Sequence, residues 1–499
     1  MKRKNTPHYI VELQLKTEIF QEDIINTRME IGRSIYNALL TIALNRFTEM
    51  TKTKRYRALY ESLIHEDTKE AKKHNKPIWK QIDAMYTEFK LTEFDLKHDV
   101  KSMQHHFKEH IQARIAQAIA TQVYSAVCAK RFKHAKELHY KKFGTFNSLR
   151  TNENGQGIIF KGDYIAWTGL KLPIIFPNNE KSQTFIAHNL FNNLEKLKYG
   201  KIIRKEIRGR YKYYVQLVFE GTCVKSRYKL GKGRVGIDIG TSTIAVSSDT
   251  TVELKELSEG VQELEKEKLK IQRKMDRSRI SMNPNKYNEN GTPKKGNKDK
   301  WINSNRYLKL RSTYREICRK QRILRRLSHN ILSNYLLTLG DEFYVETMNF
   351  SALQKRSKKP TEYVSKNKCK RKKRYGKSIG NRAPAMLIAI IDRKLHYFGK
   401  HINKINTQKC KASQFNHVTQ EYTKKSLSTR WNTIENKLVQ RDLYSAFLIS
   451  NTDETLENFD MNLCNSKYAT FLDLHDKKIQ ELKQQKQYTN KKFLSCMGI

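Results

Sequence analysis

The chain has 499 residues, enough for about two to four domains with a sizeable core. It carries 97 Lys and Arg residues against 50 Asp and Glu residues, a formal net charge of 97 − 50 = +47, and the excess is spread over the whole length. A folded protein with this charge repels itself unless a polyanion neutralises it, so we expect a nucleic acid partner. No apolar run approaches the roughly 18 residues of a membrane span, which argues against a membrane protein.

The first half of the chain changes twice between strand and helix patterns. Residues 8–16 alternate apolar and polar side chains, as a strand does, and residues 22–47 carry apolar side chains at three- and four-residue intervals. Helical character continues to about residue 142, and residues 145–225 return to β-branched and aromatic runs broken by Gly and Asn. This succession predicts a small β-barrel with a helical domain inserted after its first strand.

The second half alternates strands and helices, the pattern of an α/β domain. Two strands joined by a tight turn are expected over 234–249, where Gly240 allows the turn. The later expected elements are helices over 253–278 and 306–339, a strand over 342–350, a basic loop around 368–374, a helix over 384–399, a strand over 401–407 and a helix from about Gln440. Residues 451–499 are polar and mostly helical, with no chemistry that the sequence assigns.

Seven cysteines are scattered along the chain, and no two of them form a C-x-x-C pair. A closed zinc site needs about four ligands, commonly at short spacing, and a large chain without a secretion signal rarely uses a disulfide framework. The N-terminal residues are basic but lack the apolar core of a signal peptide. We therefore expect free thiols and a cytoplasmic location.

Three carboxylates occupy positions where the pattern predicts burial. Asp238 lies inside the strand "RVGIDIG", Glu346 lies inside the strand "FYVETMNF", and Asp442 opens the apolar helix "RDLYSAFLI". Because an unpaired buried carboxylate is costly, each should meet a Lys, an Arg or a metal ion. Taken singly, each is explained by an ion pair, or for Asp442 by a helix N-terminus.

The order of these three motifs resembles the split RuvC nuclease domain. More narrowly, the chain is similar to the TnpB family of transposon-encoded RNA-guided nucleases and to the compact type V CRISPR effectors. The early helix "GRSIYNALL", with Arg33, Tyr36 and Asn37, is similar to a helix signature of that family. "GIDIG" alone also resembles strands of sugar kinases and actin-like ATPases, but the further phosphate-binding loops that those proteins need are not found.

The resemblance covers most of the chain and implies an α/β multidomain protein. Its parts are an RNase H-like RuvC nuclease domain and a small β-barrel (wedge) domain with an inserted helical recognition domain. The implied divisions are 1–20 and 145–230 for the wedge barrel, 21–144 for the helical recognition domain, 231–408 and 441–455 for the split RuvC domain, 409–440 for a degenerate zinc-ribbon-like target-strand loading segment, and 456–499 for a polar tail.

The activity implied by the resemblance is RNA-guided endonucleolytic cleavage of DNA next to a short flanking motif. Asp238 would bridge two Mg²⁺ ions, Glu346 and Asp442 would each hold one, and Mn²⁺ is an expected substitute. Mg²⁺ prefers oxygen ligands, and paired ions about 4 Å apart serve in-line phosphodiester hydrolysis. The implied partners are a guide RNA and double-stranded target DNA in a prokaryotic cytoplasm, at the nucleoid when DNA is bound; the oligomeric state is left open.

Basic and aromatic side chains also gather at an expected hairpin, "KIIRKEIRGRYKYY", and in the basic loop. Such residues could bind nucleic acid through phosphate contacts and base stacking, although an ordinary solvated turn would also explain the hairpin. The candidate nucleic-acid-binding residues are Arg33, Tyr36, Asn37, Lys205, Arg208, Arg210, Tyr211, Lys370 and Arg371.

The chain departs from the family pattern before its last motif. The family usually carries a zinc ribbon there, but Asn416 stands where the first cysteine would be, and only Cys410 and His417 remain nearby. Two candidates cannot complete a zinc site, so no structural zinc is expected. The segment is instead expected to be held by packing of Phe415, Tyr422, Leu427 and Trp431. A second departure is Tyr444, which stands where the family commonly has asparagine.

Two other functions stay open. One is a nuclease-inactive, guide-dependent DNA-binding repressor of the same family, which the presence of all three carboxylates disfavours. The other is an RNase H-fold DNA transposase, whose third carboxylate is typically Glu, whereas Asp442 is third here. Transposon-linked and CRISPR-linked nucleases are not distinguished.

Overall fold

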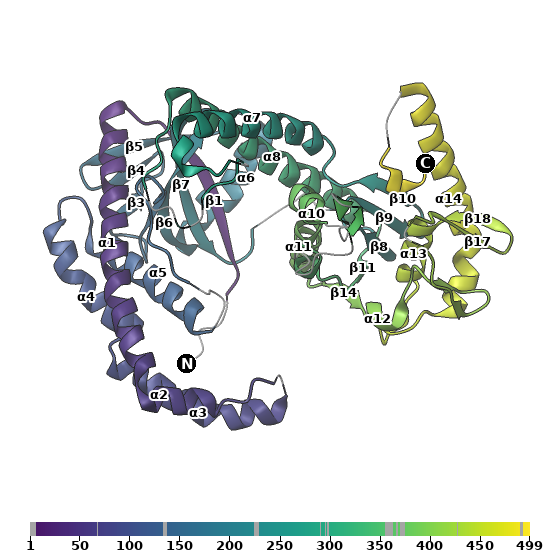
Figure 1. The fold of residues 1–499 in the computed structure, drawn as a ribbon, viewed down its shortest axis with the longest axis horizontal. Coiled ribbons are helices and arrows are strands. Elements are labelled where there is room, and N and C mark those ends of the chain that lie inside the picture. The colour runs from purple at the N-terminus through teal and green to yellow at the C-terminus, as the bar shows by residue number, and fades with distance from the viewer. Residues whose placement is uncertain are drawn as a thin grey trace. The chain divides into compact units, whose positions relative to one another are not determined.

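The computed structural model describes residues 6–499 except 67, 133–136, 224–228, 290, 295, 297–298, 355–362, 366–367, 370–374, 427 and 490–492. The chain divides into two compact units, Met1–Lys225 and Ser226–Ile499, each of which is described by itself (Figure 1). Two predicted nucleic-acid-binding residues, Lys370 and Arg371, lie outside the described residues. None of the helices described is both long and apolar enough to cross a membrane.

The first unit joins an antiparallel sheet to a group of helices. Its elements are β1 (His8–Leu15), α1 (Ile19–Lys52), α2 (Lys54–Glu61), α3 (Lys69–Glu88), α4 (Glu93–His106), α5 (Ala113–Arg131), β2 (Ser148–Arg150), β3 (Ile158–Phe160), β4 (Tyr164–Trp167), β5 (Leu170–Ile175), α6 (Glu180–Asn189), η1 (Phe191–Lys196), β6 (Leu197–Ile207) and β7 (Arg210–Glu220). The helices α1 to α5 follow the first strand, as predicted. The helix α6 and the 3₁₀ turn η1 were not predicted, since only strands were expected there.

The seven strands follow the order β2-β6-β7-β1-β5-β4-β3, and all neighbours are antiparallel. The strand β3 also packs against β6, where a Cβ on Gly200 would lie 2.9 Å from the side chain of Ile158. The sheet therefore curls back on itself, as a barrel requires. Arg28 fastens α1 to it by donating to the carbonyls of Trp167 (3.2 Å) and Thr168 (2.6 Å).

The second unit contains the segments that carry the three carboxylates. Its elements are β8 (Arg234–Ile239), β9 (Thr243–Ser248), β10 (Val252–Glu256), α7 (Val261–Met282), η2 (Pro284–Lys286), α8 (Asn305–Leu337), β11 (Glu342–Glu346), α9 (Phe350–Gln354), β12 (Tyr363–Ser365), β13 (Lys368–Cys369), α10 (Gly376–Arg382), α11 (Pro384–Leu395), η3 (His396–Phe398), β14 (Ile402–Ile405), α12 (Thr407–Cys410), β15 (Phe415–Asn416), β16 (Glu421–Tyr422), β17 (Trp431–Ile434), β18 (Lys437–Gln440), α13 (Arg441–Ser450), α14 (Met461–Thr489) and η4 (Ser495–Met497).

Its main sheet has five strands in the order β10-β9-β8-β11-β14. The strands β10, β9 and β8 are antiparallel neighbours, whereas β8, β11 and β14 run parallel. Val235, Ile237 and Val345 point into a core that includes apolar side chains of α8 and α11, and Ala245 and Tyr344 point into a second core with α13 and α14. Helices therefore cover both faces of the sheet (Figure 1).

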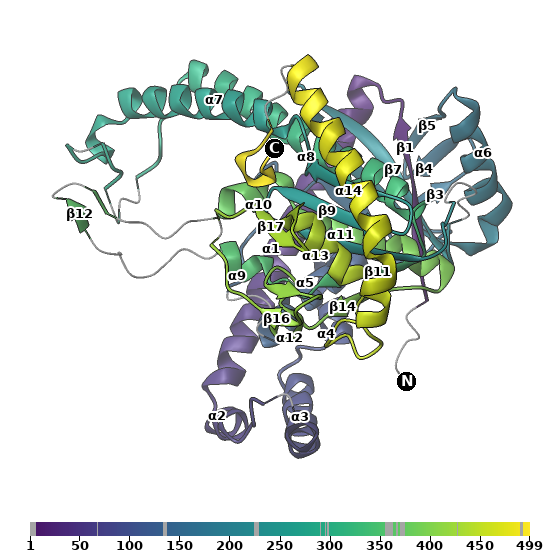
Figure 2. The same cartoon turned by 90° about the vertical axis from the view of Figure 1, so that its right-hand side faces the viewer.

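Two parts of this unit differ from the sequence prediction. Residues Val252–Glu256 form the edge strand β10, although a helix was expected from residue 253, and α7 begins only at Val261. Residues 461–489 form one helix, α14 (Figure 2). It buries Tyr468, Phe471 and Ile479 in the core that it shares with α13. The C-terminal segment is therefore a structural part of the second unit rather than a polar tail.

Candidate functional site

The parallel pairing of β8 and β11 brings two of the three carboxylates to one edge of the sheet. Val345 lies opposite Ile237 in the register, so the next step along both strands places Glu346 beside Asp238. Glu346 is the last residue of β11 and not the middle of a longer strand, as the sequence had suggested. Ligand sites of α/β sheets commonly form at the carboxyl ends of parallel strands, which is where these side chains lie.

The helix α13 brings the third carboxylate to the same place. Gly236 is two residues before Asp238 and shares its face of the sheet, and a Cβ at Gly236 would collide with the carbonyl of Ala446 and the amide of Ser450. Asp442 lies one helical turn before Ala446. The close approach at Gly236 thus directs the first turn of α13 toward Asp238.

The electrostatics of Asp238 depend on both other carboxylates. Burial raises the pKa of Asp238 well above its usual value, and the charges of Asp442 and Glu346 raise it further, while Arg441 opposes them. Burial also raises the pKa of Glu346 to about 7. Like charges held together in a poorly solvated place favour protonation or the arrival of a cation. The sequence signal for this cluster was carboxylates within otherwise apolar strands and a helix.

Two arginines lie beside the third carboxylate. Arg441 donates to Oδ1 of Asp442 through Nε and Nη2, both at 3.4 Å, and Nη1 of Arg430 lies 3.9 Å from Oδ2. Arg441 is buried and also donates to the carbonyl of Ser426 at 3.2 Å. Asp442 additionally lies in the first turn of α13, where the helix dipole favours a negative charge.

The start of α13 is fixed by the C-terminal segment. The Gln440 side chain caps the helix by accepting from the amide of Leu443 at 2.8 Å, and its Nε2 donates to the carbonyl of Met497 at 3.2 Å. The amide of Gln440 donates to Nε2 of His475 on α14 at 3.0 Å, and His475 is only 1% exposed. Sequence reasoning missed this role of α14, although its apolar side chains recur at helical spacing.

The donor set is compatible with magnesium in kind, because three carboxylates supply the hard oxygen ligands that Mg²⁺ prefers. Within the described residues, however, no three His, Cys, Asp or Glu side chains are gathered closely enough to hold a metal ion. Mutual repulsion opposes closer approach of the carboxylates, and Arg441 contacts Asp442. To bind a cation together, the carboxylates of Asp238, Glu346 and Asp442 would have to move closer to one another.

The segment between α12 and α13 is held by aromatic packing. The rings of Phe415 and Tyr422 lie 4.8 Å apart, and Nε1 of Trp431 donates to the carbonyl of Gly498 at 3.1 Å. These contacts agree with the predicted packing of Phe415, Tyr422 and Trp431, while Leu427 lies outside the described residues.

Both predicted remnants of the zinc ribbon have other partners. His417 is 2% exposed, and its Nδ1 lies 2.7 Å from the hydroxyl of Tyr444, which also accepts from the His417 amide at 3.1 Å. The rings of Phe447 and Tyr468 complete the surroundings of His417. The thiol of Cys410 lies 3.8 Å from a backbone carbonyl. Tyr444 therefore joins α13 to this segment.

The three residues of the early helix signature make contacts within their own unit. Arg33 pairs with Glu30 at 2.7 Å, and the ring of Tyr36 is buried. The Asn37 side chain donates to the carbonyl of Lys141 at 2.9 Å and accepts from its amide at 2.8 Å. These contacts fasten the chain that leads from the helices back to the sheet, and a nucleic-acid contact for the three residues stays a prediction.

The expected hairpin is confirmed. Ile207 pairs with Arg210, and Arg208 and Gly209 between them have φ values of +51° and +77°, as a two-residue type I′ turn requires. Arg208 and Arg210 are exposed at the tip. Lys205 forms an ion pair with Glu12 and lies over the ring of Tyr214, while Tyr211 lies under the guanidinium of Arg204. Nucleic-acid binding by this hairpin stays a prediction.

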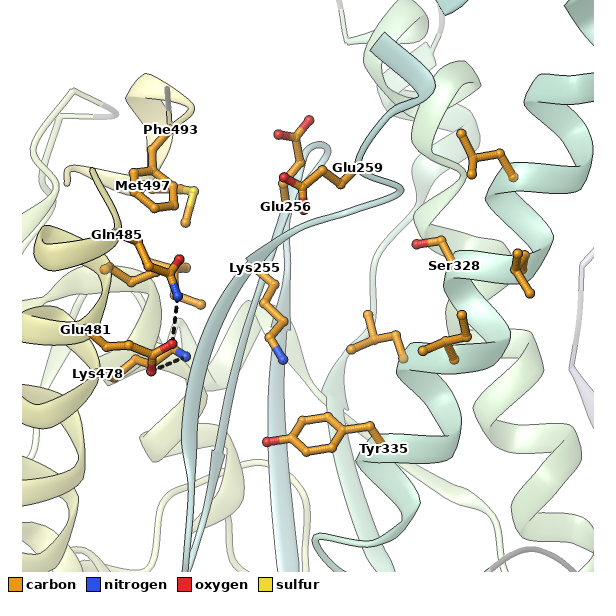
Figure 3. A pocket seen from close by; sticks show the side chains of 16 residues that line it. Lys255, Glu256, Glu259, Ser328, Tyr335, Lys478, Glu481, Gln485, Phe493 and Met497 are labelled. Carbon is orange, nitrogen blue, oxygen red and sulfur yellow. Dashed lines mark hydrogen bonds and ion pairs between the residues drawn. The ribbon is translucent and has the colours of Figure 1, made fainter. Parts of the chain in front are cut away.

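A large pocket of about 670 Å³ lies elsewhere in the second unit, among β10, α8 and α14 (Figure 3). Lys478 pairs with Glu481 at its wall, at 2.8 Å, and Gln485 donates to the same carboxylate at 2.9 Å. None of the three candidate carboxylates lines it, so it is separate from the cluster.

No family model matches the chain, and no curated protein matches it. Among solved structures, the chain is similar to a protein in a cryo-EM structure of the Cas12f1–sgRNA–target DNA complex, with 12% identity, a TM-score of 0.42, and coverage of 90% of this chain and 99% of the other. It is also similar to a protein in a cryo-EM structure of a CRISPR-Cas12f ternary complex, with 12% identity, a TM-score of 0.24, and coverage of 89% and 99%. At these scores no function follows from the likeness.

Proposed function

We propose that this chain is an RNA-guided DNA endonuclease of the RuvC type, belonging with the TnpB-like and compact type V nucleases. One observation carries the proposal: Asp238, Glu346 and Asp442, which are far apart in the sequence, come to one edge of the same sheet. Their order along the chain agrees with that of the family's three catalytic motifs.

The chemistry follows from that cluster. Mg²⁺ ions, when bound, supply an activated water and charge cancellation for phosphodiester hydrolysis. Asp238, Glu346 and Asp442 would hold them. Arg441 keeps Asp442 in place through two hydrogen bonds at 3.4 Å, and the N-cap Gln440 fixes the turn that carries both residues. The chain's +47 charge draws the phosphate backbone of the DNA toward an acidic centre that would otherwise repel it.

The proposed partners are a guide RNA and double-stranded target DNA. Base pairing with the guide would select the target, and the protein would read a short flanking motif and duplex shape. The curled sheet of the first unit and its helices, with the exposed Arg208 and Arg210 at a hairpin tip, are the proposed grip on the guide–target duplex.

The experiment starts with protein expressed together with the genomic DNA that flanks its gene. RNA that copurifies is sequenced, and a plasmid library with matching targets and randomised flanks is supplied with Mg²⁺. We expect cleavage of matched targets beside one flanking motif. Guide-dependent binding without cleavage at any target would favour the repressor, and failure to retain a defined RNA would contradict guidance. The flanking genomic DNA itself, with repeat arrays or transposon ends, separates the two kinds of nuclease.

A further inference from the structure

A second pocket in the second unit shares one residue, Glu346, with the carboxylate cluster. It has a volume of about 320 Å³ and is lined by Glu346 together with apolar side chains of β8, β11 and α11, among them Ile239, Val345 and Ile388. We call it the edge pocket. Its volume lies near the lower end of the range for small-ligand sites, about 300–1,000 Å³.

The edge pocket adjoins the candidate nuclease centre at Glu346, which lines it. Ile239 directly follows Asp238 and Val345 directly precedes Glu346, so the two apolar side chains point to the opposite face of the sheet, toward α11. Both apolar neighbours line the pocket, as does Glu346. A DNA strand whose phosphate lies at the carboxylates therefore has an adjoining nucleoside within reach of this pocket.

The lining suits a flat aromatic nucleobase inside the pocket, with the charged sugar–phosphate backbone of the nucleic acid outside it. Phe350, the first residue of α9, offers a partly buried ring, and Met348 and Ile388 add apolar contacts. Exposed Lys404 lies at the same pocket, where it can contact a phosphate. Asp392 is already engaged, since its Oδ1 accepts from the amide of Ile402 at 3.0 Å. Nucleobases stack on aromatic side chains with little dependence on sequence.

We propose that the edge pocket takes one unpaired nucleobase of the DNA strand that is being cut, with Phe350 as the stacking residue. This inference rests on the proposed function and deepens it, because a base in the pocket cannot also be paired in a duplex. The pocket therefore sets where along that strand the cut falls.

The test is a scan with abasic nucleotides. Single-stranded DNA matched to the copurified guide carries one abasic site, moved stepwise through the cut region, and cleavage rates are measured with the full-length protein. For the wild type we expect a rate loss of about tenfold at one position and little change elsewhere. The Phe350→Ala protein should cleave intact DNA about tenfold more slowly than the wild type. An abasic site at the sensitive position should not slow it further, because the substitution and the abasic site remove the same contact.

Two further variants complete the design. Phe398→Ala removes a ring that is 40% exposed and does not line the pocket, so its abasic profile should match the wild type. Ala385→Trp, at an exposed position of the lining, fills the pocket without disturbing the core and should reproduce Phe350→Ala even if that variant proves unstable.

Two results would contradict base binding in the edge pocket while leaving the proposed nuclease activity in place. One is a wild-type cleavage rate that is the same at every abasic position. The other is a Phe350→Ala protein in which the abasic site causes a further loss of rate on top of that caused by the substitution. A wild type that binds its guide and target but cuts no strand would overturn the nuclease and this inference together.

Discussion

Gly236 is the residue that lets the candidate centre assemble. The centre needs α13 pressed onto β8, and only a residue without a side chain allows the contacts with Ala446 and Ser450. Sequence reasoning placed Gly236 in a strand but could not see the helix above it, because that contact joins segments more than 200 residues apart. The carboxylates themselves were predictable, since an Asp or Glu in an apolar run is conspicuous.

We expect Gly236→Ala to destabilise the second unit by about 1–3 kcal/mol, because the methyl group forces α13 away from β8. Chemical denaturation measures this change. The control is Gly380→Ala in α10, where no atom lies within 4 Å of the new Cβ and where alanine favours the helix. Equal stabilities for Gly236→Ala and the wild type would contradict the close packing.

At the scale of elements, α13 is held from two sides. His475 and Met497 fix its first turn, while Tyr444 ties its middle to the segment that carries His417. These links explain how the segment between α12 and α13 is held in place. They were not predictable from spacing alone, because each joins an ordinary-looking polar or aromatic side chain to a distant element.

Tyr444→Phe tests the link between α13 and the segment that carries His417. The variant leaves the buried amide of His417 without its acceptor, so we expect a loss of about 1–3 kcal/mol in unfolding free energy. Tyr422→Phe is the matched control, since Tyr422 is 50% exposed and its change should stay within about 0.5 kcal/mol. A Tyr444→Phe protein as stable as that control would show that the hydrogen bonds add nothing.

The same packing bears on zinc. We expect chelator-washed protein to contain no stoichiometric zinc, because His417 bonds Tyr444, Cys410 lies against a backbone carbonyl, and two ligands do not close a site. Elemental analysis measures the content. One tightly held zinc per chain would contradict this, and its loss in Cys410→Ser would then identify the first ligand.

Elsewhere the element boundaries show what local sequence can and cannot decide. The long helices α1 and α8 and the strands β1, β8 and β14 follow from periodicity, which their own residues carry. The strand β10 does not: "VELKE" is composed largely of good helix formers, and its pairing with β9 overrides that preference. In α14 the spacing of Tyr468, Phe471, Leu472 and His475 was a readable signal of a buried face.

At the scale of the whole molecule, the chain combines a net charge of +47 with a cluster of three carboxylates at one sheet edge of its second unit. In the proposed function the basic charge would serve binding and the acidic cluster would serve chemistry, so the two should be separable by mutation. Composition alone predicts a polyanionic partner. That Asp238, Glu346 and Asp442 come together can be seen only in the folded structure.

The most direct measurement compares cleavage and binding of one target by the wild type, Asp238→Asn and Asp249→Asn. Asp249 is an exposed control that pairs with Lys467 at 2.6 Å. For Asp238→Asn we expect a loss of cleavage of about a thousandfold, the equivalent of several kcal/mol of lost charge stabilisation, with unchanged guide-dependent binding. Its melting temperature should equal or exceed that of the wild type, because burial and like charges raise the pKa of Asp238 and favour a neutral side chain. Cleavage by Asp238→Asn at the rate of Asp249→Asn would contradict the RuvC-type centre.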